Sequence, residues 1–333
     1  MIRIPVTDPS QVAEARRRAA ELAEAGGFGE TDAGRVALVA TEMATNLIKH
    51  GGGGDLLAGS YADPTGTGIE LIALDQGAGM GRPQDCIADG YSSAGTAGHG
   101  FGAIIRQSHF VDIGSWLGLG TAVLARLEAG NPPASKPTLQ AAYGAVSVAL
   151  PGEDVCGDSW SVVPEAQGLC LLAADGLGHG PNAAAASVQA VRLFRGHSGH
   201  RIPTILEYIH GGMRSTRGAA IAIARLDEAA GKVEFGGVGN IAGAIVSDTG
   251  VKRMVSLAGT AGHNMRTAQS FDYPFNGGLV LMHSDGLSTG WSLERYPGLA
   301  HAHPTLIASV LFRDYWRQRD DVTVLVARGA GIT

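Results

Sequence analysis

The chain has 333 residues, of which 45% are hydrophobic and 17% charged, so two domains with full apolar cores are expected rather than one. Its net charge of −6, with no basic cluster longer than Arg16–Arg18, argues against nucleic acid as the main partner. The sequence shows no cationic leader and no apolar stretch of about 18 residues, and its three cysteines form no CxxC pair, so a cytoplasmic protein without membrane association is expected.

The first part of the chain is predicted to open with a helix. In Asp8-Pro9-Ser10-Gln11 an N-cap is followed by a proline at the first helical position and a glutamine, and good helix formers continue from Val12 to Ala25. A second helix is predicted from residue 31 to residue 50, where four glycines end it. The further predictions here are strands near 55–61, 69–74, 110–116 and 120–127, a glycine-rich loop over 76–100 and a helix near 101–109.

Residues 130–138, GNPPASKPT, have the composition of a linker and separate a domain of residues 1–129 from one of residues 139–333. The second domain is rich in short apolar runs, which favours two stacked antiparallel sheets with outer helices and hence an α/β (α+β) fold class for the whole. Its predicted strands are 142–149, 158–163, 169–174, 219–226, 232–238, 241–247, 279–283 and 322–327, and its predicted helices are 181–196, 203–213 and 304–318.

Three polar residues share one side of the second predicted helix. Glu42, Asn46 and His50 are spaced i, i+4, i+8 beside an apolar stripe, so they rise along one flank of the helix. A carboxylate, a carboxamide and an imidazole in such a column could hold a hydrated divalent ion and act as a base. The alternative is an ordinary polar helix face.

Two glycine-rich motifs follow. Asp75-x-Gly77-x-Gly79 ends a strand on a carboxylate that could accept from the amino group of a flat ring, although it could also be a simple turn. Gly98, Gly100 and Gly102 precede a helix, and bare N–H groups beside a helix N-terminus suit phosphates.

Together, and in this order, these motifs resemble the GHKL ATPase/kinase superfamily, in particular the anti-sigma-factor serine kinases of the RsbT, RsbW and SpoIIAB group. The resemblance implies a Bergerat-type α/β sandwich that binds ATP with Mg²⁺ over about residues 10–127. By the same resemblance, Asn46 binds Mg²⁺, Asp75 holds the adenine amino group and Glu42 is the base. Gly120 and Thr121 close the site near the adenine, and residues 81–100 form a lid over the phosphates.

A second set of carboxylates adjoins the strands of the second domain. Asp158, Asp175, Asp285 and the pair Asp320-Asp321 each stand at a strand end, and Gly176 and Gly286 follow two of them. An aspartate cannot lie in an apolar core without a partner, so these residues either open surface turns or converge on a cation. Hard oxygen ligands of this kind suit Mg²⁺ or Mn²⁺ rather than zinc.

The sequence GDSW, DGLGHG, VGN, SDGL and DDVTVLV, in that order, resembles the metal-dependent type 2C protein phosphatases of the SpoIIE/RsbX branch over about residues 140–328. The resemblance implies an αββα sandwich with two Mn²⁺ or Mg²⁺ ions and hydrolysis of phosphoserine or phosphothreonine. It also implies metal ligands at Asp158, Asp175, the Gly176 carbonyl, Asp285 and Asp321. His179 is either a general acid or a residue that shapes the next helix, and Asn240 is expected to organise the site.

These features favour a bifunctional regulator that phosphorylates a STAS-domain protein of a sigma-factor or stressosome system with one domain and dephosphorylates it with the other. One alternative is that the first domain only binds ATP and a partner, such as a sigma factor. Another is that nucleotide gates the phosphatase. No nucleic-acid or membrane partner is expected.

Overall fold

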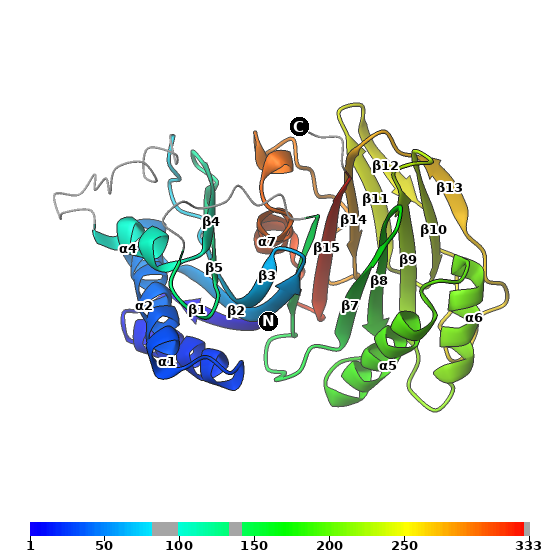
Figure 1. Cartoon of the computed structure of the whole chain (residues 1–333), viewed down its shortest axis with the longest axis horizontal. Coiled ribbons are helices and arrows are strands. Elements are labelled where there is room, and N and C mark those ends of the chain that lie inside the picture. Colours follow the sequence, from blue (N-terminus) through cyan, green and yellow to red (C-terminus); the bar gives the residue numbers. More distant parts are fainter. Residues whose placement is uncertain (82–98, 133–141, 330–333) are drawn as a thin grey trace. The chain divides into compact units, whose positions relative to one another are not determined.

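The computed structural model describes residues 1–81, 99–132 and 142–329. Contacts within the chain define two compact units (Figure 1). Unit 1 comprises Met1–Ala141 together with Ser292–Arg313, and unit 2 comprises Ala142–Trp291 together with Asp314–Thr333. The predicted linker 130–138 ends three residues before the junction at Ala141, and most of it lies outside the described residues. Because the chain returns to unit 1 for residues 292–313, a single linear boundary does not describe the contacts.

Unit 1 is built on one antiparallel sheet of order β1-β2-β3-β5-β4. Helices pack on it, and the second of them ends in a π-helical turn over Leu47–Gly51. In chain order the elements are β1 (Ile2–Val6), α1 (Ser10–Ala25), α2 (Glu30–Asn46), β2 (Gly54–Asp63), β3 (Gly66–Leu74), α4 (His99–Gln107), β4 (Phe110–Trp116) and β5 (Gly120–Leu127).

The prediction that a helix opens the chain is wrong, because β1 precedes it. Ile4 and Val6 are buried while Pro5 is exposed, an alternation too short to stand out in the sequence, and β1 pairs antiparallel with β2 at the sheet edge, where a proline is tolerated. The start of α1 is as predicted. Asp8 Oδ1 accepts from Ser10 N at 2.9 Å, and Gln11 Oε1 accepts from Asp8 N at 2.9 Å, a reciprocal cap.

The core of unit 1 lies between α1, α2 and one face of the sheet. Alanines at 15, 19 and 23 of α1 are fully buried and let α2 approach closely, and the predicted stripe of α2, including Val36, Val39 and Met43, packs beneath them. In β5, Val123, Ala125 and Leu127 belong to this core, so the intervening Arg126 points to the opposite face.

The second segment of unit 1, Ser292–Arg313, lies on that opposite face. It contains the short helix η2 (Leu299–His301) and most of α7 (Pro304–Tyr315). Arg126 Nη2 donates to Thr305 Oγ1 at 3.4 Å, and Asp112 Oδ2 of β4 accepts from His303 N at 2.7 Å. Every residue of α7 from Pro304 to Phe312 is buried, as expected of a helix without a polar face.

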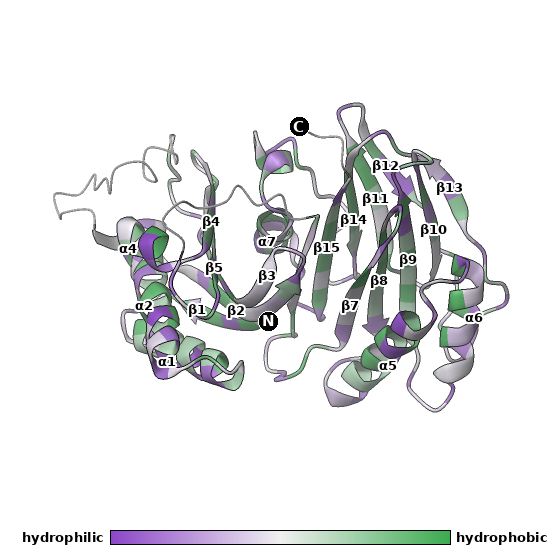
Figure 2. Ribbon diagram, viewed as in Figure 1, coloured by the Kyte–Doolittle hydropathy of each residue, from purple (hydrophilic) through white to green (hydrophobic). Residues whose placement is uncertain are grey.

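Unit 2 is a sandwich of two five-stranded antiparallel sheets, with orders β13-β10-β9-β8-β7 and β12-β11-β14-β15-β6. Their facing sides enclose one apolar core, and α5 (Pro181–His197) and α6 (Ile202–Gly212) cover the outer face of the first sheet. Figure 2 shows the apolar character of these strands. The strands are β6 (Tyr143–Val148), β7 (Asp158–Glu165), β8 (Gly168–Gly176), β9 (Ala219–Asp227), β10 (Lys232–Val238), β11 (Ala242–Ser247), β12 (Gly250–Met254), β13 (Phe271–Pro274), β14 (Gly278–His283) and β15 (Val322–Gly329).

The predicted α/β (α+β) fold class is confirmed, and the predicted strands of unit 2 are all present. The sequence analysis missed β12 and β13. Both are edge strands, and three consecutive residues of β12, 251–253, are exposed, so the apolar pattern that marks a core strand is absent there.

Leu47 offers a test of the unit 1 core, with Leu38 of the same helical region as a matched control. Leu47 is 2% exposed and Leu38 is 42% exposed. We expect Leu47→Ala to lower the free energy of unfolding by about 2–5 kcal/mol, because it leaves a cavity, and Leu38→Ala to change it by less than about 0.5 kcal/mol. Urea denaturation followed by tryptophan fluorescence measures both, and equal losses would contradict the packing described.

Candidate functional sites

The N-terminal site begins where α2 changes its winding. Glu42 and Asn46 lie in regular helix and are half-buried, but His50 lies in the π turn of Leu47–Gly51 and is exposed. The i→i+5 bonding of that turn breaks the regular column predicted through His50. Gly52, at φ +71°, ends the helical segment in the left-handed conformation.

Asp75, directly after β3, has one carboxylate oxygen engaged by the backbone. Its Oδ1 accepts from Gly77 N at 2.9 Å and from Thr121 N at 3.1 Å, and its own N–H donates to Thr121 O at 3.0 Å. Both carboxylate bonds use Oδ1, so Oδ2 is the oxygen that can accept from a ligand. A Cβ on Gly51 would lie 2.5 Å from Asp75 Cβ, so the end of the π turn approaches Asp75 as only glycine allows.

The loop after Asp75 is held by a second set of contacts that the sequence analysis did not find. Ser115 Oγ accepts from Met80 N at 2.7 Å and lies 2.9 Å from Thr121 Oγ1. Gly79 takes φ +67°, and a Cβ there would lie 2.0 Å from Trp116 O. The register of β4 with β5 pairs Ser115 with Thr121, and this pairing could not be read from the motif.

The predicted phosphate-binding glycines are only partly within the described residues. Gly100 and Gly102 lie in the first turn of α4, as expected for backbone that faces an anion. Gly98 lies outside the described residues, as does most of the predicted lid over 81–100. The described part of the predicted nucleotide site therefore comprises the end of α2, the Asp75 loop and the start of α4.

In unit 2, the strand ends bring predicted ligands together. Asp158 begins β7 and is the register partner of Asp175 near the end of β8. A Cβ on Gly176 would lie 2.0 Å from Ala183 O, so glycine is needed where α5 approaches. Asp285 follows β14, and Asp321 directly precedes β15, the neighbouring strand.

These carboxylates repel one another in a poorly hydrated site. Burial, followed by the charges of Asp158 and Asp285, raises the pKa of Asp175 to about 9. Burial raises the pKa of Asp158 to about 7, against the opposing effect of its hydrogen bond from Ser284. Burial and the charge of Asp320 raise the pKa of Asp285 as well. Bound cations would compensate this charge.

The donor set fits a hard divalent ion. Asp158 Oδ2 accepts from Ser284 Oγ at 2.6 Å, whereas the buried Oδ1 has no hydrogen-bond partner in the structure. A buried carboxylate oxygen without a partner is costly unless a cation meets it. Within the described ranges, no group of three or more His, Cys, Asp or Glu side chains is arranged so that it could hold a metal ion without rearrangement.

The two adjacent aspartates before β15 differ in their surroundings. Asp321 is 2% exposed, and both its oxygens accept from backbone, Oδ1 from Leu150 N at 2.8 Å and Oδ2 from Gly157 N at 2.9 Å. Asp320 and Asp321 both contribute to the raised pKa of Asp175, and Asp320 also contributes to that of Asp285. Because backbone N–H groups engage both oxygens of Asp321, the hydrogen bonds favour Asp320 over the predicted Asp321 as the ligand, with Asp321 fixing the loop that precedes Asp158.

The two polar residues beside these carboxylates have specific partners. Asn240 Nδ2 donates to Asp285 Oδ2 at 2.6 Å, which agrees with an organising role. His179 is 57% exposed, and its Nδ1 lies 2.5 Å from Glu153 Oε1. This contact would orient the imidazole, and both predicted roles of His179, as a general acid and as a residue that shapes the start of α5, stay predictions.

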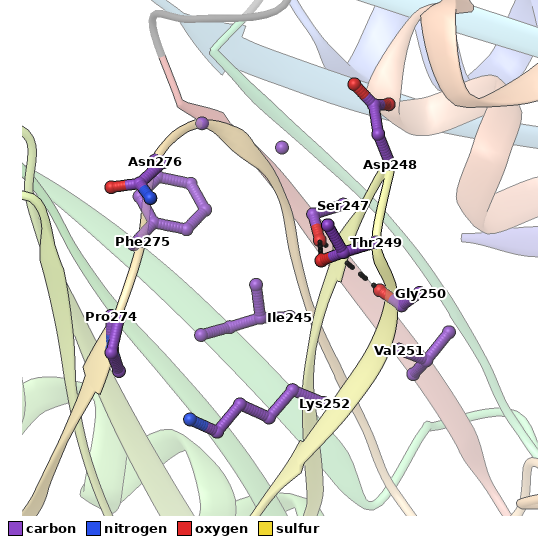
Figure 3. Close-up of a pocket in the computed structure, with 12 residues that line it drawn as sticks. Ile245, Ser247, Asp248, Thr249, Gly250, Val251, Lys252, Pro274, Phe275 and Asn276 are labelled. Carbon is purple, nitrogen blue, oxygen red and sulfur yellow. Dashed lines mark hydrogen bonds between the residues drawn. The ribbon is translucent and has the colours of Figure 1, made fainter.

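A separate pocket of about 470 Å³ lies between the turn joining β11 to β12 and residues 274–278 (Figure 3). Lys252 and Asp248 are the charged residues among those that line it. None of the predicted site residues contributes to it, so we do not assign the chemistry of unit 2 to this pocket.

The fold and these sites define a nucleotide-binding α/β domain joined to a carboxylate-rich phosphatase-type sandwich. The family of histidine kinase-like ATPase domains matches residues 6–125, and the family described as stage II sporulation protein E (SpoIIE) matches residues 165–329. Serine/threonine-protein kinase RsbT of Bacillus subtilis (strain 168) is 30% identical over 114 residues, which are 34% of this chain and 86% of RsbT.

A solved structure described as "The bacterial stressosome: a modular system that has been adapted to control secondary messenger signaling" is 31% identical, with a TM-score of 0.53, over 56% of this chain and 98% of that one. The chain thus belongs to the RsbT-related family of histidine kinase-like ATPases, and its second part matches the SpoIIE family over residues 165–329. Among the described residues, no helix is both long and apolar enough to cross a bilayer.

Charge repulsion in unit 2 predicts a pH effect on metal-free stability. Because the pKa of Asp175 is about 9 in the folded chain and near 4 when unfolded, the unfolded state binds fewer protons and stability falls as pH rises through this window. In EDTA, Asp175→Asn should therefore be more stable than wild type, by on the order of 2 kcal/mol at pH 8 and by less at pH 5. Urea denaturation at both pH values measures this, with the exposed Asp248→Asn as control. An equal gain at both values would contradict it.

The surroundings of Asp320 and Asp321 predict different defects. Asp320→Asn should weaken Mn²⁺ binding by at least about 10-fold with little loss of stability. Asp321→Asn should lower the free energy of unfolding by about 1–3 kcal/mol, since an amide cannot accept from both Leu150 N and Gly157 N. Calorimetric Mn²⁺ titration and urea denaturation separate the two. The reverse pattern would restore Asp321 as the ligand.

Proposed function

We propose that the chain is a bifunctional partner-switching regulator, which phosphorylates a serine or threonine of a STAS-domain protein with unit 1 and removes phosphate from that protein or its neighbour with unit 2. The observation that carries the proposal is the presence, on one chain, of a nucleotide site with Glu42 intact and a carboxylate site with an unpartnered buried oxygen on Asp158. Similarity to RsbT, itself described as a serine/threonine-protein kinase, supports the first activity.

In unit 1, each residue has a role in binding or proton transfer. Asp75 Oδ2 accepts from the adenine amino group, while Thr121 and Gly77 hold the other oxygen in place. Asn46 would help to hold a Mg²⁺ ion, which would supply neutralisation of the charge on the transferred phosphoryl group. Glu42, one turn before Asn46, takes the proton from the acceptor hydroxyl. Gly79, His50, Gly100 and Gly102 line the remainder of the nucleotide site, and the role of Gly98 stays a prediction from the sequence.

In unit 2, Asp158, Asp175, Asp285 and Asp320 would hold two Mn²⁺ or Mg²⁺ ions, together with the Gly176 carbonyl. When bound, these ions supply Lewis-acid activation of water and of the phosphoryl group. Asn240 orients Asp285, and Ser284 orients Asp158, so that the carboxylates face the ions rather than the surrounding backbone.

Fusion of the two units has a quantitative consequence. A substrate complex docked on one unit is held near the other at an effective concentration that can reach the millimolar range, so phosphorylation and its reversal act on the same complex. STAS-domain anti-sigma-factor antagonists or stressosome scaffold proteins are the proposed substrates, with a sigma factor as a second candidate partner.

The kinase activity can be tested in a chain whose phosphatase is silenced by Asp285→Asn. With γ-labelled ATP and a STAS-domain protein, we expect label on that protein, and a loss of at least about 100-fold when Glu42→Gln is added, because the base is removed. The exposed Glu24→Gln serves as the matched control and should leave the rate unchanged. Wild type should show less accumulated label than Asp285→Asn.

No label on any STAS protein, with ATP still bound, would contradict the bifunctional proposal. It would favour the alternative in which the ATPase domain binds ATP and a partner and only the phosphatase is catalytic.

A further inference from the structure

Arg313, near the end of α7, contacts the backbone of the nucleotide site. Its Nη1 donates to Asp75 O at 2.8 Å and lies 3.4 Å from Thr121 O. Both residues belong to unit 1, as does Arg313 itself. In the sequence, however, Arg313 lies between Asp285 and Asp320 of the phosphatase, so no motif of the ATPase domain contains it.

The contact falls where strand pairing stops. Leu74 and Ala122 are the last register pair of β3 with β5, and one further bond joins Asp75 N to Thr121 O. Asp75 lies beyond the last pair of these strands, and its carbonyl oxygen accepts a hydrogen bond from the Arg313 guanidinium. A charged donor that meets two carbonyls makes stronger bonds than a neutral one.

The same two residues hold the adenine-facing carboxylate. Thr121 N donates to Asp75 Oδ1, so the backbone that Arg313 fixes is the backbone that orients Oδ2. The backbones of Gly120 and Asp75 pack closely, because a Cβ on Gly120 would lie 2.1 Å from Asp75 O. A shift of the Asp75 carbonyl therefore moves its carboxylate.

The segment that carries Arg313 also contacts residues of β4 and β5. Trp116 Nε1 donates to Pro297 O at 3.0 Å, and the Trp116 ring meets Tyr296 edge-on at 5.2 Å between centroids. Asp112 accepts from His303 N, and Arg126 reaches Thr305. These contacts hold α7 in place, so the helix backbone that carries Arg313 is fixed before its side chain reaches Asp75.

We propose that Arg313 is a positioning residue of the nucleotide site, supplied by the segment between two phosphatase motifs, and that it sets adenine affinity and specificity by holding Asp75 and Thr121. The inference rests on the proposed binding of ATP by unit 1. A guanine base presents an oxygen where adenine presents its amino group, so a well-oriented Asp75 Oδ2 rejects GTP. A loosened Asp75 discriminates less.

The test uses the full-length chain and calorimetric titration with ATP and with GTP in the presence of Mg²⁺. Arg313→Ala should weaken ATP binding by about 10-fold and reduce the ATP-to-GTP preference by a similar factor. Arg313→Lys should recover part of both, because an ammonium can still donate to one carbonyl. The exposed Arg16→Ala, which also removes one positive charge, should match wild type in both measurements.

The outcomes separate this inference from the proposal beneath it. If wild type does not bind ATP, the proposed function of unit 1 fails. If wild type binds ATP and Arg313→Ala, still folded by circular dichroism, binds ATP and GTP as wild type does, the positioning role is overturned. If Arg313→Ala does not fold, Arg313→Lys decides: reduced ATP-to-GTP preference supports the role, and unchanged preference overturns it.

Discussion

Uncompensated negative charge at the ends of β7 and β8 is the constraint on which the chemistry of unit 2 depends. Asp158 and Asp175 are register partners on adjacent strands, and both are largely withdrawn from water. Backbone amides compensate Asp321, but one oxygen of Asp158 meets no donor at all. Cations beside such a group would compensate its charge, so the same repulsion that weakens the metal-free sandwich would drive metal binding.

In unit 1, the charge of Asp75 is compensated by backbone hydrogen bonds instead. Asp75 also follows a strand, but two backbone N–H groups compensate one of its oxygens and leave the other for a ligand. The carboxylate is thereby oriented without a metal ion, as recognition of a neutral, flat base requires. Both sites have an aspartate at a strand end. They differ in the number of hydrogen-bond donors that surround that aspartate.

The chain passes from unit 2 to unit 1 and back again between Asp285 and Asp320. After Asp285 the chain supplies Ser292–Arg313 to unit 1 and then returns to unit 2 before Asp320. On return, Tyr315 O accepts from Ser288 N, and Arg317 N donates to Gly286 O, both at 2.9 Å. The end of α7, at Tyr315, and the residues that follow it are therefore hydrogen-bonded to the loop that carries Asp285.

The sequence alone determined the elements whose signal is local. Capping by Asp8 and Gln11, the apolar stripe of α2 and the Asp-Gly strand ends follow from side-chain chemistry and spacing, and the ordered motifs were specific enough to indicate both domain families. The sequence did not predict the short edge strands β1, β12 and β13, because an edge strand with exposed residues lacks the apolar run that marks a core strand.

Only the tertiary structure decided which side chains meet. It distinguished Asp320 from Asp321, which the sequence shows merely as neighbours, because their difference lies in contacts with residues some 160 positions away. It paired Ser115 with Thr121 through strand register, and it brought Arg313 to Asp75 across 238 positions. Local patterns carry no information about such distances, since each contact depends on how the strands and α7 pack rather than on what precedes or follows it in the chain.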